Sequence, residues 1–438
     1  MALVNNMNDP YKDFVDFRYK PDESDIICLF RIEPANGISM KEALGRVASE
    51  SSNGTWAELT TLKEHIKKIR ARAYWVKGNY AKVAYPIELF EYGSIPQLMS
   101  ALAGNIFGMK ALKNLRLEDI AFPREYVKYF KGPQFGIDGV FEKIFKMKKR
   151  RPLLAHVPKP KVGMYTEEHA DVAKEAWLGG VDLLKDDENL TSQSFNRFED
   201  RMKLMFKYRD YAEKETGERK SYLANVTAET NEMIRRAKLV KELGGEYIMI
   251  DILTAGWSAL QTMREVAEDL GLAIHAHRAF HAAFTRNPKH GISMLVVAKL
   301  ARLIGVDQIH IGTVVGKLKA SRREVVDLDE EITLEHIDEH VDVLNEDWYG
   351  IKPVVPVSSG GLHPGLVPYV MNMLGKEIVI QAGGGIDGHP KGVRRGAEAM
   401  RQAIEATLEG ISLTEYAQDK EYSALKEALD YWGFEKPV

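Results

Sequence analysis

The chain has 438 residues, which is long enough for two domains with a large hydrophobic core in at least one of them. Its 60 basic and 63 acidic residues give a net charge of -3, so no basic excess predicts binding to nucleic acid. Cys28 is the single cysteine, which excludes a disulfide within the chain and is typical of a reducing compartment. The sequence shows neither a secretory leader near Met1 nor an apolar run of about 20 residues. We therefore expect a cytoplasmic protein that does not enter a membrane.

The first part of the chain has the pattern of an α+β domain. The expected elements are strands at 26–32, 71–77 and 81–86 and helices at 39–50 and 95–104. The second and third strands are expected to form a hairpin around Gly78 and Asn79. A turn at Gly132-Pro133 follows, so we place the domain boundary there, with one domain over residues 1–132 and another over 133–438.

From about residue 150 onward, short β-rich runs alternate with longer amphipathic segments. Strands are expected at 153–160, 181–185, 222–227, 247–253, 273–279, 308–313, 354–359 and 377–381. Helices are expected at 231–243, 258–270, 292–304, 335–345 and 363–374, and again from Val393 to the end. Eight β/α alternations over about 250 residues predict a (β/α)8 barrel. The alternative is a doubly wound open sheet, which would more naturally stop at five to seven strands.

The second of these strands ends in an unusual group of charges. Lys185 is followed directly by Asp186, Asp187 and Glu188. Carboxylates such as those of Asp187 and Glu188 are hard oxygen ligands that suit Mg²⁺. A protonated lysine cannot coordinate such an ion, but a lysine carbamylated by CO2 would become a third carboxylate. The alternative is an exposed acidic turn in which Lys185 makes ordinary ion pairs, and the turn alone does not decide between them.

Other predicted strand ends carry residues of related chemistry. In a barrel, the carboxyl ends of the strands and the loops after them build the active site. Beside Lys185–Glu188, the polar groups at such ends are Lys159 with Lys161, His275–Arg278, His310 with Gly312–Lys317, Ser358–Gly361 and Gly383–Gly385. Each group alone has a structural explanation, such as a solvated turn for the lysines or a core position for His275, His277 and His310. Their coincidence at one end of a barrel favours a functional site.

Two of these groups are glycine-rich turns after the seventh and eighth strands. Exposed backbone N–H groups in such turns cradle phosphate, and barrels frequently bind phosphate at these positions. Together with Arg278 and the lysines, the two turns predict a substrate that carries two phosphates. The run from Gly312 to Lys317 suits a loop that closes over a ligand and delivers one cation. Its alternative is a plain connection with an exposed lysine.

These residues together resemble the large subunit of ribulose-1,5-bisphosphate carboxylase/oxygenase (RuBisCO). The run GGVDLLKDDEN at 179–189 is similar to the signature of that family, and residues 277–282 and 312–318 strengthen the similarity. It extends from Glu50–Trp56 and Gly104–Gly108 to Gly383–Gly385, and the chain is most similar to the archaeal form III branch. The resemblance implies a (β/α)8 TIM barrel preceded by a ferredoxin-like α+β domain.

The resemblance also implies an activity and its partners. The expected reaction adds CO2, or O2 as a competing substrate, to the enediolate of ribulose 1,5-bisphosphate and gives two molecules of 3-phosphoglycerate, in the salvage of AMP or nucleotide ribose. The smallest active unit would be a homodimer with shared active sites, which can assemble into larger rings. A small subunit, nucleic acid and a membrane are not expected as partners.

Roles follow at the matching positions. Mg²⁺ would be held by Asp187, Glu188 and the carbamate of Lys185, with CO2 as the activator. The carbamate would take the proton at C3 of the substrate. Lys159, with Lys161 beside it, would protonate the final carbanion. His277 would assist hydration and cleavage, and Lys317 would stabilise the new carboxylate. The remaining substrate-binding positions fall into three groups: Arg278, His310 and Ser359 for one phosphate; Gly361, Gly383 and Gly384, with Gly360, for the other; and Glu50, Thr55, Trp56 and Asn105 from the partner subunit.

One position departs from the family pattern. Val157-Pro158 stands before Lys159, where the family usually has Thr-Ile. A hydroxyl and a strand N–H group are thereby lost, so turnover or substrate fit is expected to differ. Two other functions remain as alternatives: a RuBisCO-like enolase or isomerase acting on another phosphosugar, and a non-catalytic assembly or storage protein. Retention of the catalytic lysines and of His277 disfavours both.

Overall fold

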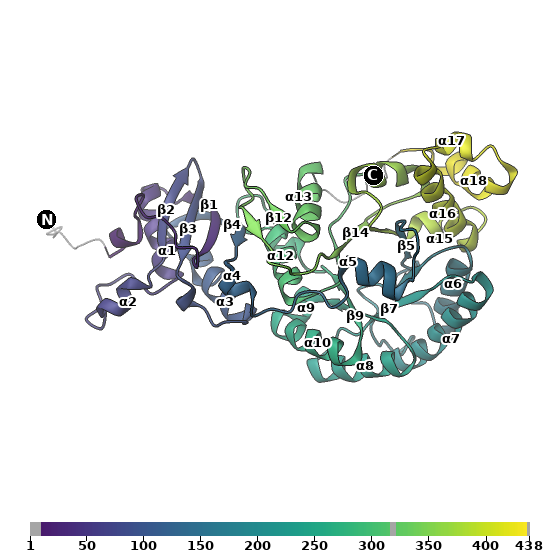
Figure 1. The fold of residues 1–438 in the computed structure, drawn as a ribbon, viewed down its shortest axis with the longest axis horizontal. Coiled ribbons are helices and arrows are strands. Elements are labelled where there is room, and N and C mark those ends of the chain that lie inside the picture. Colours follow the sequence, from purple (N-terminus) through teal and green to yellow (C-terminus); the bar gives the residue numbers. More distant parts are fainter. Residues whose placement is uncertain (1–9, 316–320, 436–438) are drawn as a thin grey trace. The chain divides into compact units, whose positions relative to one another are not determined.

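The structure is a computed structural model that describes residues 10–315 and 321–435, and it divides into two compact units (Figure 1). The N-terminal unit consists of residues 1–131, 281–303 and 334–351. The barrel unit consists of residues 132–280, 304–333 and 352–438. The chain therefore returns to the N-terminal unit twice after it first leaves it near Lys131.

The N-terminal unit is built on a mixed five-stranded sheet. Its antiparallel strands are β1 (Ile26–Pro34), β2 (Arg72–Lys77), β3 (Tyr80–Tyr85) and β4 (Leu112–Ala121). The helices α1 (Met40–Glu50) and α3 (Ile95–Leu102) interrupt them in the order βαββαβ. The sheet order β4-β1-β3-β2 is that of the ferredoxin-like fold, so this prediction is confirmed. One further strand, β10 (Gly291–Ile292), comes from a later segment and pairs parallel with β4.

Local sequence explains two of these elements. Helix α1 begins after Ser39, whose side chain accepts a hydrogen bond from the Glu42 backbone N–H, and its apolar face buries Leu44 and Val47. The predicted hairpin joins β2 and β3, and Gly78 takes a positive φ of 59° in the turn. Both predictions are confirmed.

A buried group of charges joins three segments of the N-terminal unit. Lys299 on α12 (Met294–Ile304) lies 2.9 Å from Asp119 Oδ1 on β4 and 2.8 Å from Glu346 Oε2 on β13 (Glu346–Asp347). All three side chains are buried, and the second oxygen of Asp119 accepts the backbone N–H of Leu344 at 2.7 Å. Segments that are far apart in the sequence are thus fixed by one cation.

The prediction of a helix at 335–345 is wrong. This segment instead forms β12 (His336–Ile337), which pairs antiparallel with β13. Its apolar residues suggested a helical face, but Val341 is 72% exposed and the N–H of Leu344 is bound by Asp119 instead of a helical carbonyl. The helix of this region lies earlier, as α13 (Arg322–Thr333), and it was not predicted.

The barrel unit contains a closed barrel of eight parallel strands, as predicted. In chain order the strands are β5 (Leu153–His156), β6 (Leu183–Lys185), β7 (Ser221–Asn225), β8 (Tyr247–Asp251), β9 (Ala273–His277), β11 (Gln308–His310), β14 (Val355–Ser359) and β15 (Val379–Ala382). The longer helices that follow strands are α6 (Thr166–Leu178), α7 (Phe198–Thr216), α8 (Thr230–Glu242), α10 (Trp257–Leu270), α13, α14 (Val367–Leu374) and α16 (Val393–Glu409) (Figure 1). Closure excludes the doubly wound open sheet.

The interior of the barrel changes from apolar to polar along the strands. At the amino end, side chains such as Leu153 and Leu183 pack on Phe141 from the segment formed by α5 (Gly136–Asp138) and the π-helical η4 (Gly139–Ile144). Side chains two residues apart share one face of a strand, so Lys185 follows Leu183 inward. In the same way, Asp251 follows Met249, which lies in the same apolar cluster. The polar interior therefore lies at the carboxyl ends.

The Asp307 carboxylate holds the segment that closes the amino end of the barrel. It accepts the backbone N–H groups of Phe135 at 2.7 Å, Gly136 at 3.0 Å and Ile274 at 2.9 Å. Because Asp307 is fully buried, these three hydrogen bonds supply what its carboxylate would otherwise obtain from water. The amino end is thus closed by packing and by one anion.

The end of the chain is helical, as predicted, through α16, α17 (Leu413–Tyr416) and α18 (Ser423–Trp432). Small residues let α16 and α18 pack closely, with Ala399, Ala424 and Ala428 in one buried cluster. The remaining short elements are η1 (Lys12–Phe14), α2 (Glu64–Lys68), η2 (Ile87–Leu89), η3 (Asn105–Gly108), α4 (Arg124–Val127), α9 (Ile252–Ala255), α11 (Ala282–Thr285), η5 (Pro364–Leu366), α15 (Gly384–Asp387) and η6 (Lys420–Tyr422). Among the described residues, no helix combines the length and apolar character needed to cross a bilayer.

Candidate active site at the carboxyl end of the barrel

Lys185 is the last residue of β6, and its side chain is completely buried. Its amine donates to the backbone oxygen of Asp186 at 2.8 Å and lies 3.6 Å from Glu188 Oε2. Burial lowers the pKa of the Lys185 amine, although Glu188 and Asp187 act in the opposite direction. An exposed turn with an ordinary ion pair is therefore excluded. The buried amine has the environment that favours the neutral form, which is the form able to react with CO2.

Asp186 anchors the turn that follows Lys185. Its carboxylate is fully buried and is bound by the Arg201 guanidinium at 3.2 Å, by the Asn225 backbone N–H at 3.0 Å and by the Tyr222 hydroxyl. Burial alone would raise the pKa of Asp186, but Arg201 and its other partners hold it at about 2. This acid is thus used in the barrel wall, and the carboxylates of the next two residues remain for the mouth of the barrel. The sequence analysis had left Asp186 out of the expected metal ligands but had assigned it no role.

Asp187 is paired with Lys159 from the neighbouring strand end. The Lys159 amine lies 3.0 Å from Asp187 Oδ2, and Asn189 donates its backbone and side-chain N–H groups to Asp187 Oδ1. Burial opposes ionisation, but Lys159 and the Asn189 hydrogen bonds keep the pKa of Asp187 below its usual value. The structure therefore brings together two predicted site residues from different strands.

Asp251 is a site residue that was missed. It ends β8, and its Oδ1 lies 3.3 Å from His277 Nδ1, while His277 Nε2 lies 3.5 Å from Glu188 Oε2. Burial raises the pKa of Asp251 to about 7, with Glu188 adding to the effect and Lys185 opposing it. A signal was available, since Asp251 is the one acid within the strand predicted at 247–253, two positions after the buried Met249.

The two histidines of β9 have different surroundings. His275 is completely buried, and its ring nitrogens lie 3.0 Å from Gln308 Oε1 and 3.0 Å from His310 Nε2. His275 is thus a core histidine with a hydrogen-bond partner for each ring nitrogen, as the structural explanation of this residue predicted. His277 lies closer to the mouth, beside Asp251. His310 Nδ1 lies 2.8 Å from Ser359 Oγ, so the structure also brings these two predicted residues together.

Arg278 lies against the loop after β11. Gly312 has a positive φ of 90°, and a Cβ at this position would lie 2.8 Å from Arg278 Nη2. Burial lowers the pKa of Arg278 to about 10, so the guanidinium remains charged near neutral pH. The backbone of the loop thus favours glycine at this position, and a Cβ there would displace the Arg278 guanidinium.

The glycines after β14 and β15 occupy the other two predicted loops. Gly360 and Gly361 have positive φ values of 117° and 84°. A Cβ on Gly383 would lie 2.9 Å from Lys159 Cε, so the backbone of this loop lies directly beside the lysine. Gly384 is exposed at the start of α15. Backbone groups of the eighth strand end therefore adjoin the Lys159 side chain.

Several predicted residues lie away from these contacts. Lys161 is exposed in the loop beyond Lys159, and Lys317 lies outside the described residues. Val157 and Pro158 are buried, and the Val157 N–H donates to Ala382 O at 3.2 Å. Glu50, Thr55, Trp56 and Asn105 belong to the N-terminal unit, where the Trp56 side chain is 78% exposed.

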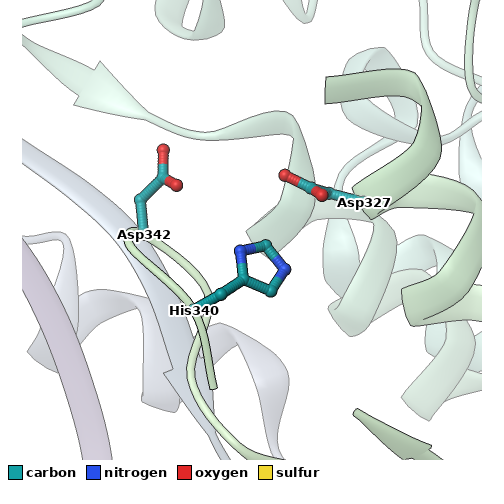
Figure 2. A group of neighbouring side chains, drawn as sticks. All are labelled: Asp327, His340 and Asp342. Atoms are coloured by element: carbon teal, nitrogen blue, oxygen red, sulfur yellow. The ribbon is translucent and has the colours of Figure 1, made fainter. Parts of the chain in front are cut away.

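Further acidic and histidine side chains lie outside the strand ends. Asp327 lies on α13, whereas His340 and Asp342 lie between β12 and β13 (Figure 2). Asp327 belongs to the barrel unit, and His340 and Asp342 belong to the N-terminal unit. We assign no metal site to these side chains, because they are divided between the two units.

Comparison with known families gives a match to both parts of the chain. Residues 137–432 match the family model for the ribulose bisphosphate carboxylase large chain, catalytic domain, and residues 13–126 match the model for its N-terminal domain. The chain belongs to the RuBisCO large-chain family. It is therefore an enzyme, a carbon–carbon lyase of the ribulose bisphosphate carboxylase type.

Individual RuBisCO relatives match over almost the full length. The ribulose bisphosphate carboxylase of Pyrococcus abyssi is 56% identical over 431 residues, which are 98% of this chain and 98% of the relative. The solved dimeric archaeal Rubisco from Hyperthermus butylicus is 52% identical with a TM-score of 0.91, covering 97% of this chain and 99% of that one. The octameric Rubisco from Pyrococcus horikoshii OT3, in complex with sulfate ion, is 53% identical with a TM-score of 0.90 and 98% coverage of both chains. These similarities confirm the resemblance to archaeal RuBisCO.

Proposed function

We propose that the carboxyl end of this barrel adds CO2 to the enediolate of ribulose 1,5-bisphosphate and cleaves the product to two molecules of 3-phosphoglycerate, with O2 as a competing substrate. The observation that carries the proposal is the buried Lys185 amine beside Asp187 and Glu188. A fully buried lysine in a polar site, with a lowered pKa, is suited to a chemical role.

The turn after β6 fits a divalent cation. Asp187 is held in its ionised form, the Glu188 carboxylate is 31% exposed, and the Lys185 amine lies 3.6 Å from Glu188 Oε2. Mg²⁺ would thus be held by Asp187, Glu188 and the carbamate of Lys185. The ion would supply a Lewis acid for the ketone and enediolate oxygens, and the carbamate would supply a base for the C3 proton. CO2 and Mg²⁺ would therefore activate the enzyme together.

Three side chains would act on the reacting carbons. Lys159, adjoining both Asp187 and Gly383, would donate the proton to the final carbanion. His277 Nδ1 accepts the Ala279 backbone N–H at 3.1 Å, and the ring lies 3.3 Å from Asp251 and 3.5 Å from Glu188. From this position His277 would assist hydration and cleavage. Lys317 would bring a cation to the new carboxylate.

The phosphates of the substrate would be bound by two groups around the mouth. Arg278, His310 and Ser359 would bind one of them, and Lys161 would contact the substrate beside Lys159. The backbone of Gly360, Gly361, Gly383 and Gly384 would bind the other. Support comes from the positive φ values at Gly360 and Gly361, which suit N–H groups that turn toward an anion.

A partner subunit would complete the site. Glu50, Thr55, Trp56 and Asn105 would come from the second chain of a homodimer, and the 78% exposure of Trp56 within its unit supports this arrangement. The dimeric and octameric forms of archaeal relatives support a homodimer that can build larger rings. From the archaeal resemblance we also infer a role in salvage of nucleotide ribose.

The deciding experiment is an assay of the purified full chain. After preincubation with bicarbonate and Mg²⁺, labelled CO2 and ribulose 1,5-bisphosphate should give labelled 3-phosphoglycerate, and its absence would refute the proposal. Lys185→Ala should lose both turnover and activation by CO2. Lys174→Ala is the matched control, because Lys174 pairs with Asp171 on the outer helix α6 and should leave activation unchanged.

A further inference from the structure

The glycine turn after β14 leads into a buried anchor. Gly360 and Gly361 offer backbone groups but have no side chains that could hold the turn in place. The next two residues, Leu362 and His363, are both buried. A Cβ on Gly385, in the turn after β15, would collide with Leu362 O and lie 2.9 Å from His363 Cα. The two glycine turns are therefore packed backbone to backbone, and Leu362 and His363 lie at their contact.

The end of the chain is bound to the same anchor. His363 Nε2 lies 2.8 Å from the backbone oxygen of Glu435, and since a carbonyl oxygen can only accept, the imidazole must donate. Trp432, the last residue of α18, stacks on the imidazole with ring centroids 5.8 Å apart and planes inclined by 27°. A Cβ on Gly365 would collide with Gly433 O, so the loop and the chain end also meet through their backbones.

Trp432 connects this anchor to the terminal helices. Its side chain packs on the buried alanines that join α16 and α18. A Cβ on Gly388, directly after α15, would lie 3.3 Å from Trp432 Cζ2. The last residues of a domain are poorly ordered unless they are tied down. Here the described end of the chain is docked, and it is docked on the two glycine turns.

The attachment of His363 consists of one hydrogen bond and one stacked ring. Burial lowers the pKa of His363, although the Glu435 carbonyl opposes the effect, so the imidazole is neutral near pH 7 and carries its proton on Nε2. Among the described residues, His363 Nδ1 has no hydrogen-bond partner. A substitution that removes the Nε2 donor is therefore not compensated by the other ring nitrogen.

We propose that His363 is a positioning residue that ties the two glycine turns to the docked end of the chain, and that this attachment raises the affinity for the phosphate bound by the turns. The effect on the substrate rests on the proposed function of these turns. Backbone N–H groups bind an anion more tightly when they are held in place beforehand, because ordering a mobile turn consumes part of the binding free energy. Trp432 and Glu435 thereby influence substrate affinity through His363.

The attachment can be tested without substrate. Phenylalanine in place of His363 keeps a ring for Trp432 but removes the donor. Amide hydrogen exchange of the full chain, measured by mass spectrometry, should be faster in His363→Phe for peptides covering 360–366 and 383–388, and unchanged for peptides covering 185–189. Unchanged exchange at both glycine turns would overturn the proposal, whether or not the chain is an active carboxylase.

Two further variants separate the attachment from a general loss of stability. Trp432→Leu removes the stacked ring and should give the same pattern of faster exchange. Tyr369→Leu is the matched control, because Tyr369 is a 55% exposed aromatic residue on α14, the helix that follows the same loop. It should leave both turns unchanged. A thermal unfolding curve of each variant checks that it is folded, and equal exchange at the turns in the two variants would contradict the role of the chain end.

Calorimetry with ribulose 1,5-bisphosphate, in the absence of CO2 and Mg²⁺, tests the effect on the substrate. His363→Phe should raise the Kd by about 2- to 10-fold, the range of one neutral hydrogen bond, and His363→Gln, which keeps a donor, should restore most of it. In the assay the KM should rise with a smaller change in kcat, and the affinity for Mn²⁺ should not change. Combined with Trp432→Leu, the effect on Kd should be less than additive.

The outcomes distinguish this inference from the proposed function. Faster exchange at the turns with an unchanged Kd would refute the effect of His363 on the substrate. Additive effects of His363→Phe and Trp432→Leu would show that the two residues act separately. Absence of binding in the unaltered chain would instead refute the proposed function of the turns, and the exchange rates would still decide the attachment.

Discussion

Lys159 and Asp187 form an ion pair of 3.0 Å between the ends of adjacent strands. The pair joins the expected proton donor to an expected metal ligand, so the lysine ammonium and a divalent cation compete for the same carboxylate. The Asp187 oxygen that faces Lys159 is the one not used by Asn189, which leaves the turn itself intact when the lysine moves.

Removal of the Lys159 charge should therefore strengthen metal binding. Lys159→Met, which keeps an apolar stem of similar length, is expected to bind Mn²⁺ or Mg²⁺ more tightly because Asp187 loses its competing cation. Turnover should be lost at the same time. Calorimetry or electron paramagnetic resonance of Mn²⁺ would measure the affinity independently of activity. Weaker metal binding in Lys159→Met would contradict the competition.

Replacement of Lys185 by arginine should prevent modification without removing the positive charge. Arginine stays protonated and cannot form the carbamate. Lys185→Arg is thus expected to show no carbon-13 carbamate signal after incubation with labelled bicarbonate and Mg²⁺, whereas the unaltered chain should show one. Lys174→Arg on α6 serves as the matched control. A persistent signal in Lys185→Arg would place the modification at a different lysine.

Gly312→Ala should separate a backbone effect from a contact with Arg278. The positive φ of 90° should cost about 1 kcal/mol of stability, and the added Cβ, at 2.8 Å from Arg278 Nη2, should displace the guanidinium and raise KM. Gly217→Ala is the control, since Gly217 has φ of 70° and no atom within 4 Å of its Cβ position. Denaturant unfolding should show a similar loss of unfolding free energy for the two variants, and only Gly312→Ala should change KM. An equal KM in both would refute a role for the contact.

Asp182 provides a prediction for acid stability. Its buried carboxylate receives two hydrogen bonds from Arg151 at 2.7 Å and one from the Leu154 backbone N–H at 2.8 Å. Burial alone would raise the pKa of Asp182, but Arg151, Arg401 and Lys220 hold it at about 2. Since the unfolded value is about 3.9, this group should contribute about 2–3 kcal/mol above pH 4, and the contribution should be lost as pH falls through about 2.

The variant Asp182→Asn isolates this contribution. It should be less stable at pH 7 by about 3–5 kcal/mol, because Arg151, whose side chain is only 15% exposed, is left without its main partner. The difference from the unaltered chain should shrink as the pH is lowered toward 2. Urea unfolding at a series of pH values measures both effects, and a difference that is independent of pH would contradict the assignment.

Much of the barrel could be predicted because its signals are local. Each strand is a short apolar run, and residues such as Lys185 and His310 stand directly at the strand ends. The chemistry of the turn at 185–188 could also be predicted, since carboxylates adjoin the lysine. The burial of Lys185 could not be predicted from these neighbours, because it depends on strands that are distant in the sequence.

The errors of the prediction from sequence also arise from contacts between residues that are far apart in the chain. The segment 335–345 carries an apolar spacing typical of a helix, but Asp119, more than two hundred residues earlier, binds its Leu344 N–H. Asp251 was overlooked because the predicted strand was extended to residue 253, which hid this acid inside it, and because its neighbour His277 belongs to a different strand. The hydrogen bonds of Gln308 with His275 and Tyr247 likewise join strands that are distant in the sequence.

The return of the chain to the N-terminal unit has a consequence for how this protein can be divided or recombined. A fragment ending near residue 131 would keep the buried Asp119 but would lose Lys299 and the strand that extends the sheet. A chimera joined at that single point would combine Asp119 of one parent with Lys299 of the other, at a site where an unpaired charge is costly. Residues 281–303 and 334–351 should therefore be inherited together with the first 131, so that a working exchange of this unit needs three matched pieces of coding sequence.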